Sequence, residues 1–171
     1  MKVVSGHKGM WFFRVVVTGK EAHSSQTHRG VSAVMTGARL IAKLDEMAKA
    51  LKAAADPNCK FVPPYTTIHV GQVQGGTAPN IISRHCEFVC DIRNLPDDFP
   101  EDIQREFESW ITAEILPEMQ AIDPNAGVAV TTENVVAGLM EDRDSEAEQL
   151  VRQITGDNDT TYVPGTYTPL R

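Results

Sequence analysis

The order in which strand and helix patterns alternate limits the fold of this chain more than any other feature. From Met10 to Thr18, apolar residues occupy every second position, which is typical of a strand with one buried face. From about Gly30 to Ala55, apolar residues recur at helical spacing in a stretch rich in alanine, lysine and leucine. The buried stripe of this long helix is expected to contain Val34, Ala38, Ile41, Met47 and Leu51.

Two strands, a second helix and a fourth strand follow. Strands are expected from Thr66 to Val73 and from about Ser83 to Arg93, where apolar and polar residues alternate again. The second helix is expected to begin at Pro100, because proline suits the first helical turn, and to end or kink at Pro117. The fourth strand is expected from Gly127 to Val136.

Right-handed crossovers over one sheet turn this order into a βαββαβ sandwich of the ferredoxin-like type. This α+β fold has four antiparallel strands and two helices on one face, with the first and third strands in the centre of the sheet. A short C-terminal helix is expected from Ser145 to Ile154. The chain would then comprise a lead-in over residues 1–8 that ends in a turn, a domain over residues 9–138, and a terminal helix and tail over residues 139–171.

Composition and charge argue against several classes of protein. The chain has 171 residues, of which 42% are hydrophobic, so it can form one domain with a core. A net charge of −7 argues against a nucleic-acid partner, since no basic surface dominates. No apolar run approaches the roughly 20 residues needed to span a bilayer, and the start does not resemble a signal peptide, so no membrane partner is expected.

The cysteines and histidines lack the spacing of metal sites. Cys86 and Cys90 lie four apart in a strand pattern, which predicts reduced, buried thiols in a cytoplasmic protein. No Cys-x-x-Cys, His-x-His, His-x-x-x-His or His-x-Asp pattern occurs, and Gly75-Gly76 is not followed by the lysine of a phosphate-binding loop. We therefore expect no metal site and no nucleotide site in this chain.

The turn from Thr18 to Ser25 carries the most distinctive polar residues. Gly19 opens it, and His23 is followed by Ser24 and Ser25. A histidine at a strand-to-helix turn rests on a rigid scaffold and still faces outward. The alternative is a solvated loop histidine in front of a serine helix cap. The two serines do not form a catalytic dyad with His23 merely by being adjacent in sequence.

Three motifs follow one another along the chain. They are Gly19-x-x-x-His23-Ser24-Ser25, Gly75-Gly76-Thr77-x-x-Asn80-Ile81-Ile82 and Cys86-Glu87-Phe88-x-x-Asp91-x-Arg93-Asn94-Leu95-Pro96. Together they resemble the dimerisation (lid) domain of the acetylornithine deacetylase and aminoacylase family, and the Arg-Asn-Leu-Pro ending points to the acetylornithine deacetylase branch. The chain departs from the family at Ser83, where proline is common, and at Tyr167, where glutamate usually follows Gly-Thr.

The resemblance implies a zinc-dependent (or cobalt-dependent) amidohydrolase that removes an acyl group from an N-acyl amino acid, with N-acetylornithine, in arginine biosynthesis, as the first candidate. In this family the domain is inserted into a larger catalytic domain that holds the metals, so this chain alone is expected to be inactive and to bind none. The resemblance also implies a cytoplasmic homodimer that forms through an edge strand and the long helix.

By resemblance, three residues carry function. His23 would reach into the active site of the partner subunit and donate a hydrogen bond to the oxyanion. Asn80 and Arg93 would bind polar groups of the substrate, with Arg93 suited to a carboxylate. Alternatively, Asn80 is only a turn residue, and Arg93 forms a surface ion pair with Asp91.

Two alternatives remain for the function as a whole. Within the family, the enzyme could be a succinyl-diaminopimelate desuccinylase or an aminoacylase. Outside it, a non-catalytic ligand-sensing or structural βαββαβ module would share the fold, because fold does not fix function.

Overall fold

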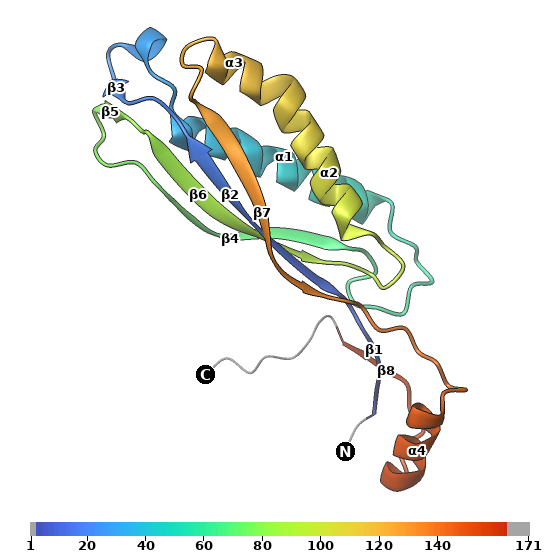
Figure 1. Cartoon of the computed structure of the whole chain (residues 1–171). Coiled ribbons are helices and arrows are strands. Elements are labelled where there is room, and N and C mark those ends of the chain that lie inside the picture. The colour runs from blue at the N-terminus through green and yellow to red at the C-terminus, as the bar shows by residue number, and fades with distance from the viewer. Residues whose placement is uncertain (1–2, 164–171) are drawn as a thin grey trace.

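The main sheet has four antiparallel strands in the order β4-β6-β2-β7, in a computed structural model that describes residues 3–163. The strands are β2 (Met10–Thr18), β4 (Thr67–Gly75), β6 (His85–Arg93) and β7 (Gly127–Val136). Helix α1 (Ala33–Ala53) and the helical segment that begins with α2 (Pro100–Trp110) lie together on one face of the sheet (Figure 1). This α+β sandwich confirms the predicted fold, with β2 and β6 central and β4 and β7 at the edges.

The core lies between the sheet and the helices. Phe13, Val15 and Val17 of β2 are completely buried, and their side chains stand opposite those of β6, with Val15 paired to Phe88 and Val17 to Cys86. Cys86 and Cys90 are both buried in this layer, as their spacing predicted. The alternation survives in the structure because each central strand has one face against the helices and the other only partly covered.

The buried stripe of α1 differs from the predicted one. Leu40, Leu44 and Met47 face the core, whereas Val34 (38% exposed) and Ala38 face outward, so that part of the prediction was wrong. Apolar residues occur on more than one side of this helix, so periodicity alone does not select the buried side. Close packing selects it instead, because a Cβ added to Gly37 would lie only 2.8 Å from the Cys86 sulfur.

The second helix continues past Pro117 instead of ending there. After α2 comes a π-helical turn, η2 (Ile111–Ile115), and then α3 (Leu116–Gln120). The Leu116 N–H donates to the carbonyl of Ile111, five residues back. Proline has no N–H for the regular i−4 hydrogen bond, and the helix continues past Pro117 by way of a widened turn just before it.

Two small strand pairs were not predicted. At one end of the molecule, β1 (Val4–His7) pairs in parallel with β8 (Thr161–Val163), where a turn and an irregular tail were expected. At the other end, β3 (Ala22–His23) pairs with β5 (Ile81–Ile82). Strands of two to four residues are too short to show a period in the sequence.

The terminal helix α4 (Glu146–Thr155) lies beside β1 and β8, beyond the end of the main sheet (Figure 1). Its first turn is capped as predicted, with the Ser145 hydroxyl accepting a hydrogen bond from the Glu148 N–H at 3.3 Å. The division of the chain at residues 8 and 138 stays a prediction, and Tyr167 lies outside the described residues. Between residues 3 and 163, no helix is both long and apolar enough to cross a bilayer.

The contact between Gly37 and Cys86 gives a test of the packing. Gly37→Ala would raise helix propensity by about 1 kcal/mol, yet we expect a net loss of about 1–3 kcal/mol in the free energy of unfolding, because the added methyl group overpacks the core. Denaturant unfolding measures this change. Gly127→Ala is the matched control, because an added Cβ there meets no atom within 4 Å.

Adding Cys86→Ala to Gly37→Ala should recover part of the loss, because the sulfur that obstructs the methyl group is gone. Strictly additive effects of the two substitutions, or a stabilising Gly37→Ala, would contradict this packing.

Candidate functional site

His23 and Asn80 meet at the end of the sheet where β3 pairs with β5 (Figure 1). His23 stands opposite Ile81 in this pair, and the Ser24 N–H donates to the Asn80 carbonyl at 2.9 Å. Both side chains are exposed. The first and second sequence motifs are therefore joined by backbone hydrogen bonds into one outward-facing site.

The turn before His23 is held by a close approach of two backbones. Lys20 and Val31 exchange two hydrogen bonds of 2.9 and 3.0 Å between their N–H and carbonyl groups. A Cβ added to Gly19 would lie 2.1 Å from the Val31 carbonyl oxygen, so only glycine fits there. The turn that carries His23 is thus fixed to the segment that leads into α1.

Ser83, the departure from the family pattern, fixes the Asn80 side of the site. Its hydroxyl accepts a hydrogen bond from the Val34 N–H at 2.9 Å, and its carbonyl accepts one from the Ala33 N–H at 2.8 Å. These groups satisfy donors at the start of α1, which otherwise lack partners within the helix. Ser83, at the position where proline is common, therefore holds this connection to the start of α1 by hydrogen bonds.

The His23 imidazole is held by its own loop. The Ser25 N–H donates to Nδ1 at 3.2 Å, and the Ser25 hydroxyl oxygen lies 2.8 Å from the same nitrogen. The alternative interpretation of the serines as a helix cap is wrong, because Ser32 caps α1 by accepting from the Met35 N–H.

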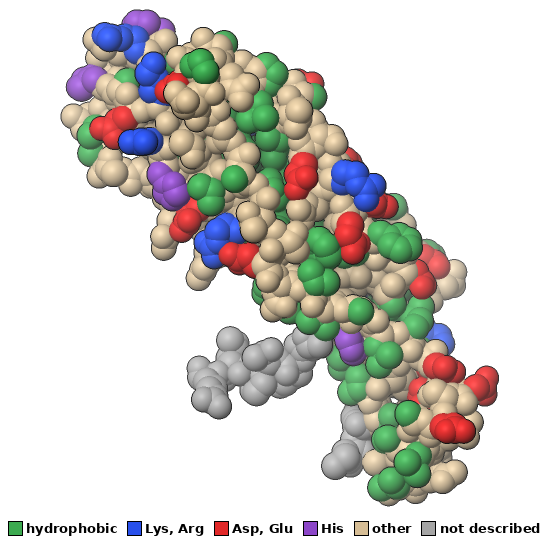
Figure 2. All heavy atoms as spheres, in the orientation of Figure 1, with side chains coloured by type: hydrophobic (Ala, Val, Ile, Leu, Met, Phe, Trp, Pro, Cys, Tyr) green, Lys and Arg blue, Asp and Glu red, His purple; other side chains and the backbone are tan. Residues whose placement is uncertain are grey.

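A shallow polar hollow of about 460 Å³ surrounds His23. Two cations, Lys20 and Arg29, and one carboxylate, Glu21, contribute to its walls. Histidine and basic side chains gather at this end of the surface in Figure 2. The local charge is therefore positive in a chain with a net charge of −7, which suits a partner or ligand with negative charge.

Arg93 lies at the opposite end of β6, on the face of the sheet away from the helices. At a rise of about 3.3 Å per residue, the nine-residue strand places it roughly 26 Å from His85, which is at the β3–β5 end. Its Nε is 2.8 Å from Asp91 Oδ1, and its guanidinium lies 5.4 Å from the centre of the Phe12 ring. The ion pair with Asp91 is present, and the structure does not bring Arg93 to His23 and Asn80.

A family model described as the peptidase dimerisation domain matches residues 5–119. The chain belongs to this family. Acetylornithine deacetylase from Myxococcus xanthus is 31% identical over 166 residues, covering 97% of this chain and 42% of that protein. Acetylornithine deacetylase from Photorhabdus laumondii is 37% identical over 93 residues, covering 54% of this chain and 24% of that protein. The chain thus spans less than half the length of these relatives.

Solved structures support the fold. An amidase of the hydantoinase/carbamoylase family from Burkholderia vietnamiensis matches with a TM-score of 0.65 at 19% identity, over 97% of this chain and 37% of that one. Aminopeptidase PepT from Bacillus cereus matches with a TM-score of 0.63 at 17% identity, over 99% of this chain and 40% of that one. At these identities the likeness concerns the fold alone.

Two polar residues of the dimerisation domain are buried, which the sequence analysis did not predict. Lys8 is 1% exposed and donates from Nζ to the Tyr65 carbonyl at 2.5 Å, and burial lowers its pKa. Asn94 is 5% exposed and lies so close to Gly9 that an added Cβ there would be 2.3 Å from its Oδ1. Both fix the end of the domain near Arg93. Lysine is rarely buried, so nothing in the sequence marks Lys8.

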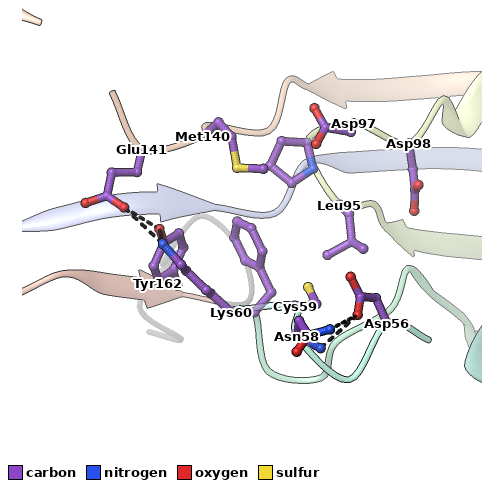
Figure 3. Close-up of a pocket in the computed structure, with 12 residues that line it drawn as sticks. Asp56, Asn58, Cys59, Lys60, Leu95, Asp97, Asp98, Met140, Glu141 and Tyr162 are labelled. Carbon is purple, nitrogen blue, oxygen red and sulfur yellow. Dashed lines mark hydrogen bonds and ion pairs between the residues drawn. The ribbon is translucent and has the colours of Figure 1, made fainter. Parts of the chain in front are cut away.

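A second hollow of about 460 Å³ lies near this same end of the dimerisation domain (Figure 3). On its wall the Tyr162 hydroxyl donates to Glu141 Oε2 at 2.6 Å, and Lys60 Nζ lies 3.6 Å from the same carboxylate. The hydrogen bonds from Tyr162 and then Arg143 lower the pKa of Glu141 to about 2. None of the three expected site residues lines this hollow. The contact between Lys60 and Glu141 joins the terminal segment to the domain.

Metal ligands are not grouped in the part of the dimerisation domain that the structure describes. Among residues 3–163, no cluster of three or more histidine, cysteine, aspartate or glutamate side chains could hold a metal ion.

Proposed function

We propose that this dimerisation domain completes the active site of a larger amidohydrolase that removes the acyl group from an N-acyl amino acid, with N-acetylornithine as the first candidate substrate. The observation that carries the proposal is the union of His23 and Asn80 in one exposed, rigidly held site. The similarity to acetylornithine deacetylase from Myxococcus xanthus along nearly the whole chain supports the choice of substrate.

In this proposal His23 supplies a hydrogen bond to the reacting carbonyl oxygen. Amide hydrolysis passes through a tetrahedral species whose oxygen carries a negative charge, and a preorganised donor lowers the barrier. Imidazole donates a hydrogen bond in either protonation state, provided that the outward nitrogen carries a proton. Asn80 would hold a polar group of the same substrate.

The position of Arg93 supports the use of two subunits. Arg93 lies roughly 26 Å or more from the His23 end by strand geometry, so both cannot contact one small amino-acid derivative from a single subunit. Asp91 engages two of its five N–H groups, Nε and Nη2, which leaves donors for a substrate carboxylate. We infer that His23 and Asn80 serve the partner's active site, while Arg93 serves its own.

The dimer would form along β4 and α1. β4 is an edge strand, and an unpaired edge is a template for pairing with another chain. Ala38 and Ala42 of α1 and Val73 of β4 itself (58% exposed) present small or apolar side chains there, and a groove of about 410 Å³ runs between α1 and β4. A second copy paired in antiparallel fashion would cover both features and extend the sheet to about eight strands.

The proposed cofactor is zinc or cobalt held by other parts of the enzyme. The described residues of this chain do not fit a metal site, so we derive no step through a metal bound here. The proposed setting is arginine biosynthesis in the cytoplasm. The three free cysteines suit a reducing compartment.

The role of His23 is tested by kinetics of the full-length enzyme. We expect His23→Ala to lower kcat for N-acetylornithine by about 10²–10³, the usual effect of losing an oxyanion donor, with little change in KM. His85→Ala is the control, because His85 is also an exposed histidine of this end, and its side chain faces Glu87 at 3.7 Å. Equal effects of the two substitutions would contradict the role of His23.

The dimer surface is tested on the chain itself by light scattering at tens of micromolar. We expect the wild type to be a dimer and Ala42→Lys to be a monomer, because a charge would be buried at the interface. Ala50→Lys is the matched control. It is exposed on the same helix but lines a hollow beside α2, so the dimer should persist. A dimer that tolerates Ala42→Lys as well as Ala50→Lys would refute this surface.

A further inference from the structure

Ser25 turns two groups toward one nitrogen of His23. Its backbone N–H donates to Nδ1 at 3.2 Å, and its hydroxyl oxygen lies 2.8 Å from the same atom. No hydrogen bond within the described chain engages Nε2 of this exposed side chain. The two ring nitrogens therefore have different surroundings, one inside the loop and one outside.

The backbone N–H decides which nitrogen carries the proton. A peptide N–H can only donate, so Nδ1 must offer its lone pair. In neutral imidazole one nitrogen carries the proton and the other accepts, so the proton is on Nε2. The tautomer with a proton on Nδ1 would bring two N–H groups face to face and lose this hydrogen bond.

The loop leaves Ser25 little freedom to turn away. On one side of it, the Ser24 N–H donates to the Asn80 carbonyl at 2.9 Å. On the other, the Gln26 N–H donates to the His23 carbonyl at 2.8 Å, which closes a tight turn around Ser25. Because both neighbouring peptides are fixed, the direction of the Ser25 N–H is set by the fold rather than by the imidazole.

The Ser25 hydroxyl also favours the tautomer with the proton on Nε2. With Nδ1 unprotonated, the Ser25 hydroxyl donates to it, so the hydroxyl and the backbone N–H favour the same tautomer. Both groups of Ser25 thus act on the histidine through the same nitrogen, Nδ1.

We propose that Ser25 is a positioning residue that keeps the His23 proton on Nε2, so that Nε2 is the atom that donates to the oxyanion. The oxyanion role rests on the proposed function above, whereas the tautomer is a property of this chain alone. The two parts therefore have separate tests.

The tautomer is tested by nitrogen NMR of the ¹⁵N-labelled chain. Two-bond proton–nitrogen correlations distinguish the protonated from the unprotonated nitrogen of each neutral imidazole, and the His23 signals are assigned by their loss in His23→Gln. At a pH where the spectrum shows the neutral ring, we expect only Nε2 to carry a proton. A proton on Nδ1, or an even exchange between the two forms, would overturn the proposal.

Two variants separate the hydroxyl from the backbone. Ser25→Thr keeps both groups, so its spectrum should match that of the wild type. Ser25→Ala keeps only the N–H, so Nε2–H should remain the major form while a detectable share of Nδ1–H appears. An Ser25→Ala spectrum identical to that of the wild type would contradict a role for the hydroxyl.

The donor atom is tested in the full-length enzyme with amide side chains. The glutamine amide nitrogen reaches near the Nε2 position, and that of asparagine reaches only near Nδ1. We expect His23→Gln to retain a kcat about tenfold above that of His23→Asn, the effect of one hydrogen bond.

The outcomes of these experiments distinguish the two proposals. If His23→Ala has normal activity, the proposed function fails, whatever the NMR spectrum shows. If His23→Ala is impaired but His23→Asn outperforms His23→Gln, only the assignment of Nε2 fails.

Discussion

The backbone contact between the turn after β2 and the segment before α1 is the constraint on which the proposed site depends. Lys20 and Val31 exchange two hydrogen bonds, and Gly19 allows the backbones to approach within a distance that no side chain would permit. Ser83 then ties the start of α1 to the β5–β6 connection. Three segments are fixed at one point, with His23 on β3 and Asn80 directly before β5, the strand that pairs with it.

The same architecture separates the candidate site residues along the sheet. One end carries an imidazole and an amide in a locally positive hollow. The other end carries Arg93, already paired with Asp91, near the buried Lys8 and Asn94 that secure the lead-in strand. A rigid sheet between them keeps these groups apart, so cooperation on one small substrate requires a second subunit. The exposed edge along β4 and α1 is where such a subunit would pair.

Periodicity in the sequence was sufficient to predict the main sheet and its helices. The alternation in β2 and β6 marks two strands that are half-covered, and it predicted the burial of Cys86 and Cys90. It could not predict which side of α1 is buried, because apolar residues lie on several sides and the choice depends on Gly37 meeting Cys86. Nor could it predict β1, β3, β5 and β8, whose pairing depends on tertiary contacts.

The roles of the three site residues stay a prediction. The resemblance implied that His23, Asn80 and Arg93 act on substrate, with His23 delivered to the partner subunit, but spacing along a chain carries no information about distance across a sheet. The structure joins the first two through the Ser24–Asn80 hydrogen bond and leaves Arg93 at the far end of β6. The contact of Ser25 with His23 Nδ1 could not be predicted from the sequence either, since adjacent serines and histidines adopt many loop geometries.

Delivery of His23 to the partner's active site is tested most directly by hybrid dimers of the full-length enzyme. One subunit carries His23→Ala, and the other carries an intact His23 but an inactivated catalytic domain. Neither homodimer should be active, and mixing them should restore one working site per heterodimer. If such heterodimers form without activity, while hybrids of wild-type and inactivated subunits remain active, His23 serves its own subunit and delivery between subunits is contradicted.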